Sequence, residues 1–141
     1  MPRSSRTPRV QTDAEVLRFL SVADDLPEIA WRSASDPRDR VFNERWFQLT
    51  GMLAWDAIGS GWRAAIHPED RERCDELHER ASLSRRPFEI DYRVRNAKGD
   101  YCWIRERGQP SRRHSYVYLG VCALIDCSQA RVPEAILAEQ Y

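Results

Sequence analysis

The sequence contains no long run of apolar residues and no excess of charge of either sign. Its 141 residues include 22 basic and 22 acidic side chains, so the formal net charge is zero. A neutral chain has no overall field that would attract nucleic acid or an anionic membrane, and we expect neither as a partner. The start of the sequence, "MPRSSRTPRV", also lacks the apolar core of a signal peptide. We therefore expect a cytoplasmic protein without a membrane span.

Histidine is scarce, and the cysteines lack the spacing of a metal site. There are three histidines and four cysteines, and no two cysteines form a C-x-x-C pair. A structural zinc site needs such spacing, so we predict no metal site. We interpret Cys74, Cys102, Cys122 and Cys127 as reduced, small buried side chains, with a bridge between Cys122 and Cys127 as the alternative.

The remaining composition is that of one folded domain. Hydrophobic residues make up 42% of the chain and include five tryptophans, which is enough apolar surface for one core. Thr12 and Glu15 form a capping box, and apolar residues then recur at helical spacing until Pro27. The predicted organisation is a disordered arm (1–11), a flanking helix (12–25), a domain (26–128) and the start of a linker helix (129–141).

The first part of the domain predicts a hairpin followed by short helices. Residues 28–33 are typical of a strand, and "DPRDR" supplies the turn into a second strand at residues 40–42. A short helix is expected next, with Asn43 as its cap and Gly51 as its end. The glycine-punctuated stretch 52–66 predicts one or two further helical turns.

A longer helix is predicted to begin at "IHPED". Pro68 suits the first helical position, and Glu69 and Asp70 place negative charge at the positive end of the helix. His67 and Glu69 form an H-x-E pair, but zinc deaminases with that pair need a downstream P-C-x-x-C that is absent here. The apolar stripe of the helix consists of Cys74, Leu77, His78 and Ala81.

The last part of the domain alternates with a period of two. Residues 88–95 and 101–108 predict a hairpin around the turn at 96–100. Residues 115–126 are apolar on both faces, which predicts a central strand covered on both sides. The sequence thus predicts an α+β fold: a five-stranded antiparallel sheet, with helices inserted between strands two and three and one helix flanking the N-terminus.

Four segments, in the order that the family requires, resemble a PAS domain of the subgroup with a PAC motif. They are "VFNERWFQLTG" (41–51), "GWRAAIHPEDRE" (61–72), "PFEIDYRVRNAKGDYCWIRERGQP" (87–110) and "LGVCALID" (119–126). The family's exit signature, Asp-Ile-Thr, is written here as Asp126-Cys127-Ser128. The resemblance implies a sheet curved over a small pocket, a homodimer through flanking helices, and an attached kinase, cyclase or transcription output.

The resemblance also implies cofactor options, which we leave open. Haem-binding PAS proteins take their axial ligand from the helix that carries His78, whereas the alternative is a partly buried histidine with a hydrogen-bonded ring. Aerotaxis-type PAS domains that bind FAD share the H-P-x-D pattern of residues 67–70, but the Asn-Cys-Arg-Phe segment of the light-sensing subgroup is absent. A small-molecule ligand or a filled pocket is the other option. The candidate cofactor-binding residues are Trp46, Trp55, Trp62, His78, Tyr92 and Trp103.

Two functions are compatible with these patterns. The first is a non-catalytic sensory or dimerisation module of a bacterial signal transduction protein, such as a sensor kinase, a diguanylate cyclase or a regulator, which passes a change to an output domain. The second is a small α+β enzyme with a cone-shaped pocket and an Asp–His acid/base pair. The candidate pairs for that chemistry are His78 with Asp75 and His67 with Asp70.

Overall fold

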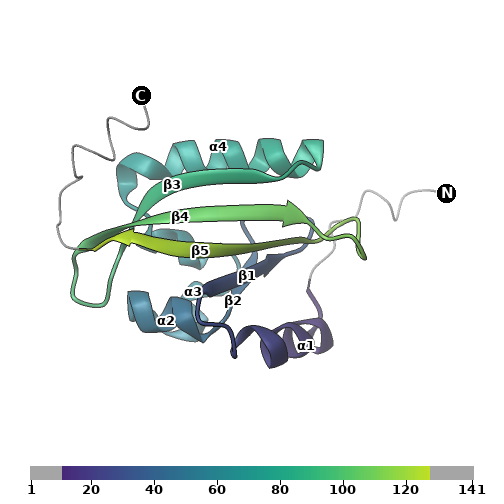
Figure 1. Cartoon of the computed structure of the whole chain (residues 1–141), viewed down its shortest axis with the longest axis horizontal. Helices are drawn as coiled ribbons and strands as arrows, with labels where there is room; N and C mark the ends of the chain where they lie inside the picture. The colour runs from purple at the N-terminus through teal and green to yellow at the C-terminus, as the bar shows by residue number, and fades with distance from the viewer. Residues whose placement is uncertain (1–10, 128–141) are drawn as a thin grey trace.

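Five antiparallel strands organise the computed structural model, which describes residues 11–127 (Figure 1). Their order in the sheet is β2-β1-β5-β4-β3, and each neighbouring pair is antiparallel. The predicted α+β fold is confirmed, including the central place of the last strand. The arm before residue 11 and the linker helix from residue 129 lie outside the described residues. The strands are β1 (Ile29–Ser33), β2 (Arg40–Phe42), β3 (Phe88–Arg95), β4 (Tyr101–Pro110) and β5 (Tyr118–Asp126).

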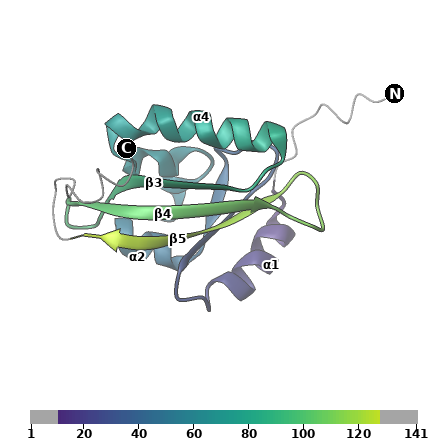
Figure 2. The same ribbon diagram turned by 45° about the horizontal axis from the view of Figure 1, so that its top comes forward.

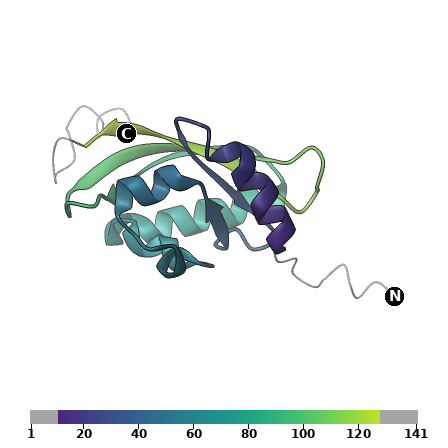
Figure 3. The same cartoon turned by 90° about the horizontal axis from the view of Figure 1, so that it is seen from below.

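Helices between β2 and β3 cover one face of this sheet, which we call the inner face (Figures 2 and 3). The opposite face is the outer face. The flanking helix α1 precedes β1 and lies against it. Over residues 11–127, no helix combines the length and the apolar character that crossing a bilayer needs. The helices are α1 (Asp13–Ala23), α2 (Glu44–Thr50), α3 (Ala54–Ala57), the 3₁₀ helix η2 (Gly61–Ala65) and α4 (Pro68–Ser84).

Two predicted helix signals are confirmed in detail. Thr12 and Glu15 form the capping box of α1. His67 is the N-cap of α4, and its ring Nδ1 accepts a hydrogen bond of 3.1 Å from the backbone N–H of Glu69. Pro68 then occupies the first helical position, where no backbone N–H is required. The "HPE" sequence is thus explained by helix initiation.

The prediction that Asn43 caps α2 is only partly correct. Asn43 occupies the N-cap position, but its side chain makes no capping bond. The fully buried amide instead accepts from the backbone N–H of Ala30 and donates to the carbonyls of Ala23 and Glu28. Asp24, just after α1, accepts a hydrogen bond from the first N–H of α2 at Glu44. Asn43 therefore joins α1, β1 and α2, which are separate in the sequence.

The prediction that β5 is covered on both faces is wrong. On the outer face, Leu119 and Ile125 are 36% and 37% exposed, and Ala123 is also exposed. The helices that the sequence inserts between β2 and β3 lie on the inner face only, so no element between residues 11 and 127 covers this part of β5. The outer face of β5 is therefore apolar and open.

The prediction of four reduced cysteines is wrong for two of them, and the alternative bridge between Cys122 and Cys127 is wrong as well. Cys102 of β4 forms a disulfide with Cys127, the residue after β5, while Cys74 and Cys122 are free and buried. The reason is the register of the β4 and β5 pair. It slips at Trp103, so that the end of β5 lies beside the start of β4.

Candidate functional site

Two glycines on neighbouring strands leave room on the inner face for one large side chain. Gly108 of β4 and Gly120 of β5 are register partners, and Trp31 of β1 pairs with Gly120. A Cβ at Gly120 would lie 2.2 Å from the indole of Trp31, and one at Gly108 would lie 2.4 Å from the ring of Phe88. The centroids of the Trp31 and Phe88 rings are 6.2 Å apart. The indole of Trp31 thus occupies the space over the middle of the sheet.

A buried ionic network lies beside this indole. Glu106 of β4 binds the guanidinium of Arg40 from β2 through both carboxylate oxygens. Its Oε1 lies 2.5 Å from Nε2 of His78 on α4, and its Oε2 accepts a hydrogen bond of 3.0 Å from the hydroxyl of Tyr92 on β3. None of these four side chains belongs to a residue more than 3% exposed. Glu106 is therefore removed from water and satisfied by three separate elements.

Aromatic rings enclose the cation of this network. The guanidinium carbon of Arg40 lies 3.6 Å from the ring centroid of Trp31 and 4.4 Å from that of Trp62. Both indoles are almost completely buried. Cation–π attraction is strongest when the cation is desolvated, so the two rings add to the stabilisation that Glu106 provides.

The network has a definite charge state. Burial by itself would raise the pKa of Glu106, but the charges of Arg40 and His78 and their hydrogen bonds hold that pKa below its ordinary range. For His78, burial together with the charge of Arg40 lowers the pKa, against the opposing effect of Glu106. Burial also raises the pKa of Tyr92 well above its ordinary value. The network thus favours an anionic Glu106 beside the Arg40 cation, whereas burial opposes a charge on His78 and on Tyr92.

The structure brings four of the six predicted cofactor-binding residues together in the interior. The other two lie elsewhere. Trp55 on α3 is 70% exposed, and Trp103 is buried on the outer side of β4, with its ring 5.3 Å from the guanidinium carbon of Arg93. The role of any of them in binding a cofactor stays a prediction. The four in the interior are Trp46, Trp62, His78 and Tyr92.

Arg40 and Glu106 form the charged centre of the interior, and neither was predicted from the sequence. Arg40 follows a turn sequence rich in charge, where an exposed side chain is the usual interpretation. Glu106 carries a detectable signal, because it occupies the same alternating positions of β4 as the buried Cys102 and Ile104. A carboxylate at such an inward position requires a buried partner.

Neither haem nor flavin fits this interior. Axial ligation of haem by His78 requires a free ring nitrogen and open space, whereas its Nε2 contacts Glu106 and its ring lies against Phe88 and Trp62. The space on the inner face over Gly108 and Gly120 is filled by the Trp31 indole and the Phe88 ring, which leaves no space there for a flavin ring. The residues present therefore form a packed interior in place of a cofactor site.

The two candidate acid/base pairs do not form. Asp75 binds Arg63, and Asp70 binds the guanidinium and the backbone N–H of Arg93. His78 contacts Glu106, which lies in a network that Arg40 neutralises. Among residues 11–127, no three side chains of the metal-binding types are grouped so that they could hold an ion. The observed pairs stabilise the packing of α4 against η2 and β3.

The outer face of the sheet divides into a charged half and an apolar half. On β3 and β4, the register partners Asp91 with Arg105 and Glu89 with Arg107 form ion pairs. On β5 the outward residues Leu119, Val121 and Ala123 are apolar, and on β1 the outward residues are Ala30 and Arg32. The guanidinium of Arg32 is paired with Glu15 of α1, which lies beside this half. A groove of about 760 Å³ runs between α1 and this half. Residues that line it include Phe19, Val22, Leu26, Ala30, Leu119 and Val121.

Comparison with protein families gives one match over more than half of the chain. A family model described as "PAS fold" matches residues 40–121. The curated protein y4lL of Sinorhizobium fredii, named as uncharacterized, is 31% identical over 118 residues. That alignment covers 83% of this chain but 14% of the relative, so the chain corresponds to a small part of a much longer protein.

Solved structures share the fold at lower identity. The N-terminal domain of a diguanylate cyclase with PAS/PAC sensor from Marinobacter aquaeolei is 21% identical, with a TM-score of 0.60, and the match covers 70% of this chain and 94% of that one. The LOV domain of the Erythrobacter litoralis EL346 blue-light activated histidine kinase is 17% identical, with a TM-score of 0.56 and coverages of 72% and 98%. Both are sensory domains of signalling enzymes.

Proposed function

Because the chain belongs to the PAS fold family, we propose that it is a signal-transducing domain that works through protein contacts on the outer face of its sheet. The similar solved domains belong to signalling enzymes, and the long relative leaves room for an output domain. The packed interior argues against a large cofactor. The observation that carries the proposal is the open apolar half of the outer face, formed by β5 beside α1.

The proposed partner on this face is a second copy of the chain. Val22 of α1 is 66% exposed, and Leu119 on β5 is 36% exposed and lines the same groove. An apolar surface shared by a helix and a sheet is self-complementary in a two-fold dimer, since each copy offers both parts. Burial of this surface from water supplies the driving force.

The charged residues around the groove also favour a second copy of the chain as the partner. Arg18, Arg107 and Arg113 line the groove, and α1 begins with Asp13 and is followed by Asp25. In a two-fold arrangement the acidic ends of one α1 lie near the arginines of the other copy. Such complementary charges favour one orientation of the two copies more than they add to the affinity.

Sedimentation velocity over a range of concentrations tests this function. We expect the protein to dimerise, and we expect Val22→Glu and Leu119→Glu to raise the dissociation constant at least about tenfold, since each buries a charge at the interface. Leu83→Glu is the matched control, because Leu83 is 81% exposed on α4, away from the outer face. A protein that stays monomeric at the highest concentration, or a Leu83→Glu variant that dissociates equally, would show the proposal to be wrong.

A further inference from the structure

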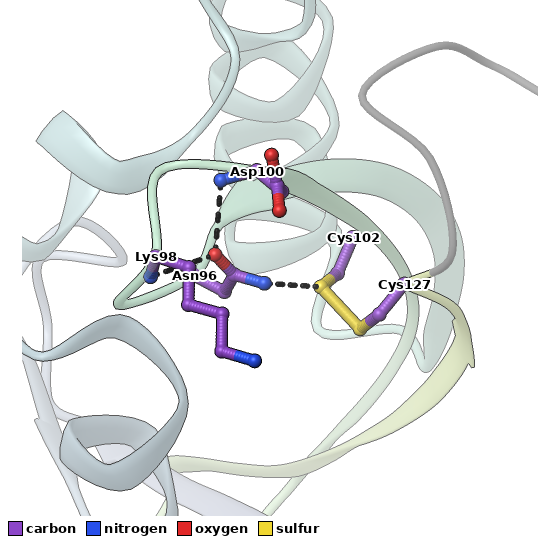
Figure 4. The surroundings of a disulfide bond; sticks show 5 residues. All are labelled: Asn96, Lys98, Asp100, Cys102 and Cys127. Atoms are coloured by element: carbon purple, nitrogen blue, oxygen red, sulfur yellow. Dashed lines mark hydrogen bonds between the residues drawn. A yellow bond between two sulfur atoms is a disulfide. The ribbon is translucent and has the colours of Figure 1, made fainter.

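We propose that the Cys102–Cys127 disulfide is an exchange site for low-molecular-weight thiols, and that its reduction releases the end of β5. The bond joins the start of β4 to the residue that follows β5, where the chain leaves the sheet (Figure 4). It does not belong to the buried network or to the apolar half of the outer face. The disulfide itself is not a proposed dimer contact, but the end of β5 that it holds includes Ile125.

The two bridged cysteine residues differ in their exposure to solvent. Cys102 is fully buried, whereas Cys127 is exposed. A thiolate in solution can therefore reach the sulfur of Cys127 and expel that of Cys102. Thiol–disulfide exchange proceeds by such an attack, and its rate depends on which sulfur is accessible and on how well the other one leaves.

Asn96 is oriented to stabilise the sulfur that leaves. Its Oδ1 accepts hydrogen bonds from the backbone N–H groups of Lys98 and Asp100 in the turn between β3 and β4. This fixes the orientation of the amide, so that Nδ2 donates to Sγ of Cys102 at 3.6 Å (Figure 4). A hydrogen bond to a thiolate favours the charged form and makes it a better leaving group.

The exchange balances with two molecules of a monothiol. The first thiolate forms a mixed disulfide with Cys127, and the electron pair of the broken S–S bond goes to Cys102. The second thiolate attacks the small-molecule sulfur of that mixed disulfide, which releases Cys127 and forms the oxidised small disulfide. Both protein sulfurs take up a proton, and both small thiols lose one. Oxidised small disulfide drives the same steps in reverse.

Register explains why the bond controls the end of β5. Regular pairing of β4 with β5 continues as far as Ile104 with Leu124, and the register then slips. Beyond the slip, Trp103 with Asp126 is the last pair that the sheet provides. The disulfide lies next to this pair and holds both strands together. Without it, a single pair beyond an irregularity anchors the end of the strand, so this end should open locally.

The first experiment compares hydrogen exchange of the oxidised and the reduced protein. After reduction by glutathione, we expect the amides of Leu124–Asp126 to exchange about tenfold faster or more, while those of β1 paired with β2 stay unchanged. Cys127→Ser should reproduce the reduced pattern without any reductant. Cys74→Ala is the control, because it removes a buried thiol and leaves the disulfide in place. Equal exchange in both redox states would overturn the proposal, and so would a Cys127→Ser variant that retains the oxidised pattern.

The second experiment measures the rate of reduction by glutathione. Asn96→Asp keeps the oxygen that accepts from the turn but removes the donor to Cys102 and adds a negative charge beside it. We expect reduction to slow about tenfold, with an unchanged free energy of unfolding of the oxidised protein. An unchanged rate would refute the role of Asn96. Peptide mapping of the oxidised protein must find Cys102 joined to Cys127, and any other pairing refutes the site.

Discussion

At the scale of single residues, Glu106 determines the chemistry of the interior. It is one carboxylate among apolar neighbours on the inner face, and Arg40, His78 and Tyr92 all direct hydrogen-bonding groups at it. Removing one partner of a buried ion pair leaves an uncompensated charge, which costs far more than the pair contributes. The network therefore specifies one arrangement of β2, β3, β4 and α4.

His78 makes the stability depend on pH. Burial, with the charge of Arg40, holds the pKa of His78 in the folded protein below its ordinary value. As the pH falls, the imidazole of the unfolded chain is therefore protonated before that of the folded protein. Stability must then decrease as the pH falls below about 6.5, by up to about 1.4 kcal/mol per pH unit, until the native pKa is reached. We predict that urea unfolding between about pH 5 and 8 shows this slope.

Two variants test whether His78 causes this dependence of stability on pH. His78→Gln should flatten the dependence on pH between about 5 and 6.5, because glutamine takes up no proton in either state. His114→Gln is the control, since His114 is exposed in the loop between β4 and β5. If the slope of His78→Gln equals that of the unchanged protein, another group is responsible.

At the scale of elements, Gly108 of β4 and Gly120 of β5 leave space for the rings of Trp31 and Phe88, which the pairing of the strands places over them. We predict that Gly120→Ala lowers the free energy of unfolding by about 1–3 kcal/mol, because its Cβ displaces the packed Trp31 indole. In a Trp31→Leu background the same change should cost much less, since the smaller side chain leaves space. Urea unfolding of the four proteins in this cycle gives the coupling. If the free-energy changes of Gly120→Ala and Trp31→Leu were strictly additive, the two residues would not be in contact.

Local patterns were sufficient to predict the elements but not the contacts between them. The cap at Thr12, the stop at Gly51 and the period-two strand at residues 88–95 depend on neighbours in the sequence, and each was correctly predicted. The bonds of Asn43, and the disulfide of Cys102 with Cys127, depend on the register of strands far apart in the sequence. Periodicity assigns each side chain to a face of the sheet but does not say which residues of two distant strands are paired.

At the scale of the whole molecule, Asn43 is the junction between the flanking helix and the sheet. We predict that Asn43→Ala lowers the free energy of unfolding by about 3 kcal/mol, because it removes three hydrogen bonds to the backbone, including the one that satisfies the buried N–H of Ala30. Gln48→Ala, on the exposed side of α2, is the control and should change the stability by less than about 0.5 kcal/mol. Urea unfolding measures both.

Asn43→Asp tests whether the hydrogen bonds of Asn43 or the volume of its side chain stabilise the protein. The carboxylate is nearly the same size and still accepts from Ala30, but it faces the carbonyls of Ala23 and Glu28 without a donor. It should therefore be as destabilising as alanine. If Asn43→Asp retains the full stability, packing alone accounts for this residue.

The indole of Trp31 fills space in the interior that a single nucleotide change could empty. In the genetic code the tryptophan codon TGG differs from a glycine codon, GGG, by one nucleotide. That single change would remove the whole ring from the space over Gly108 and Gly120 and leave a hollow bounded by Phe88 and the buried network. The filled interior and a hollow one are, at this position, one mutation apart.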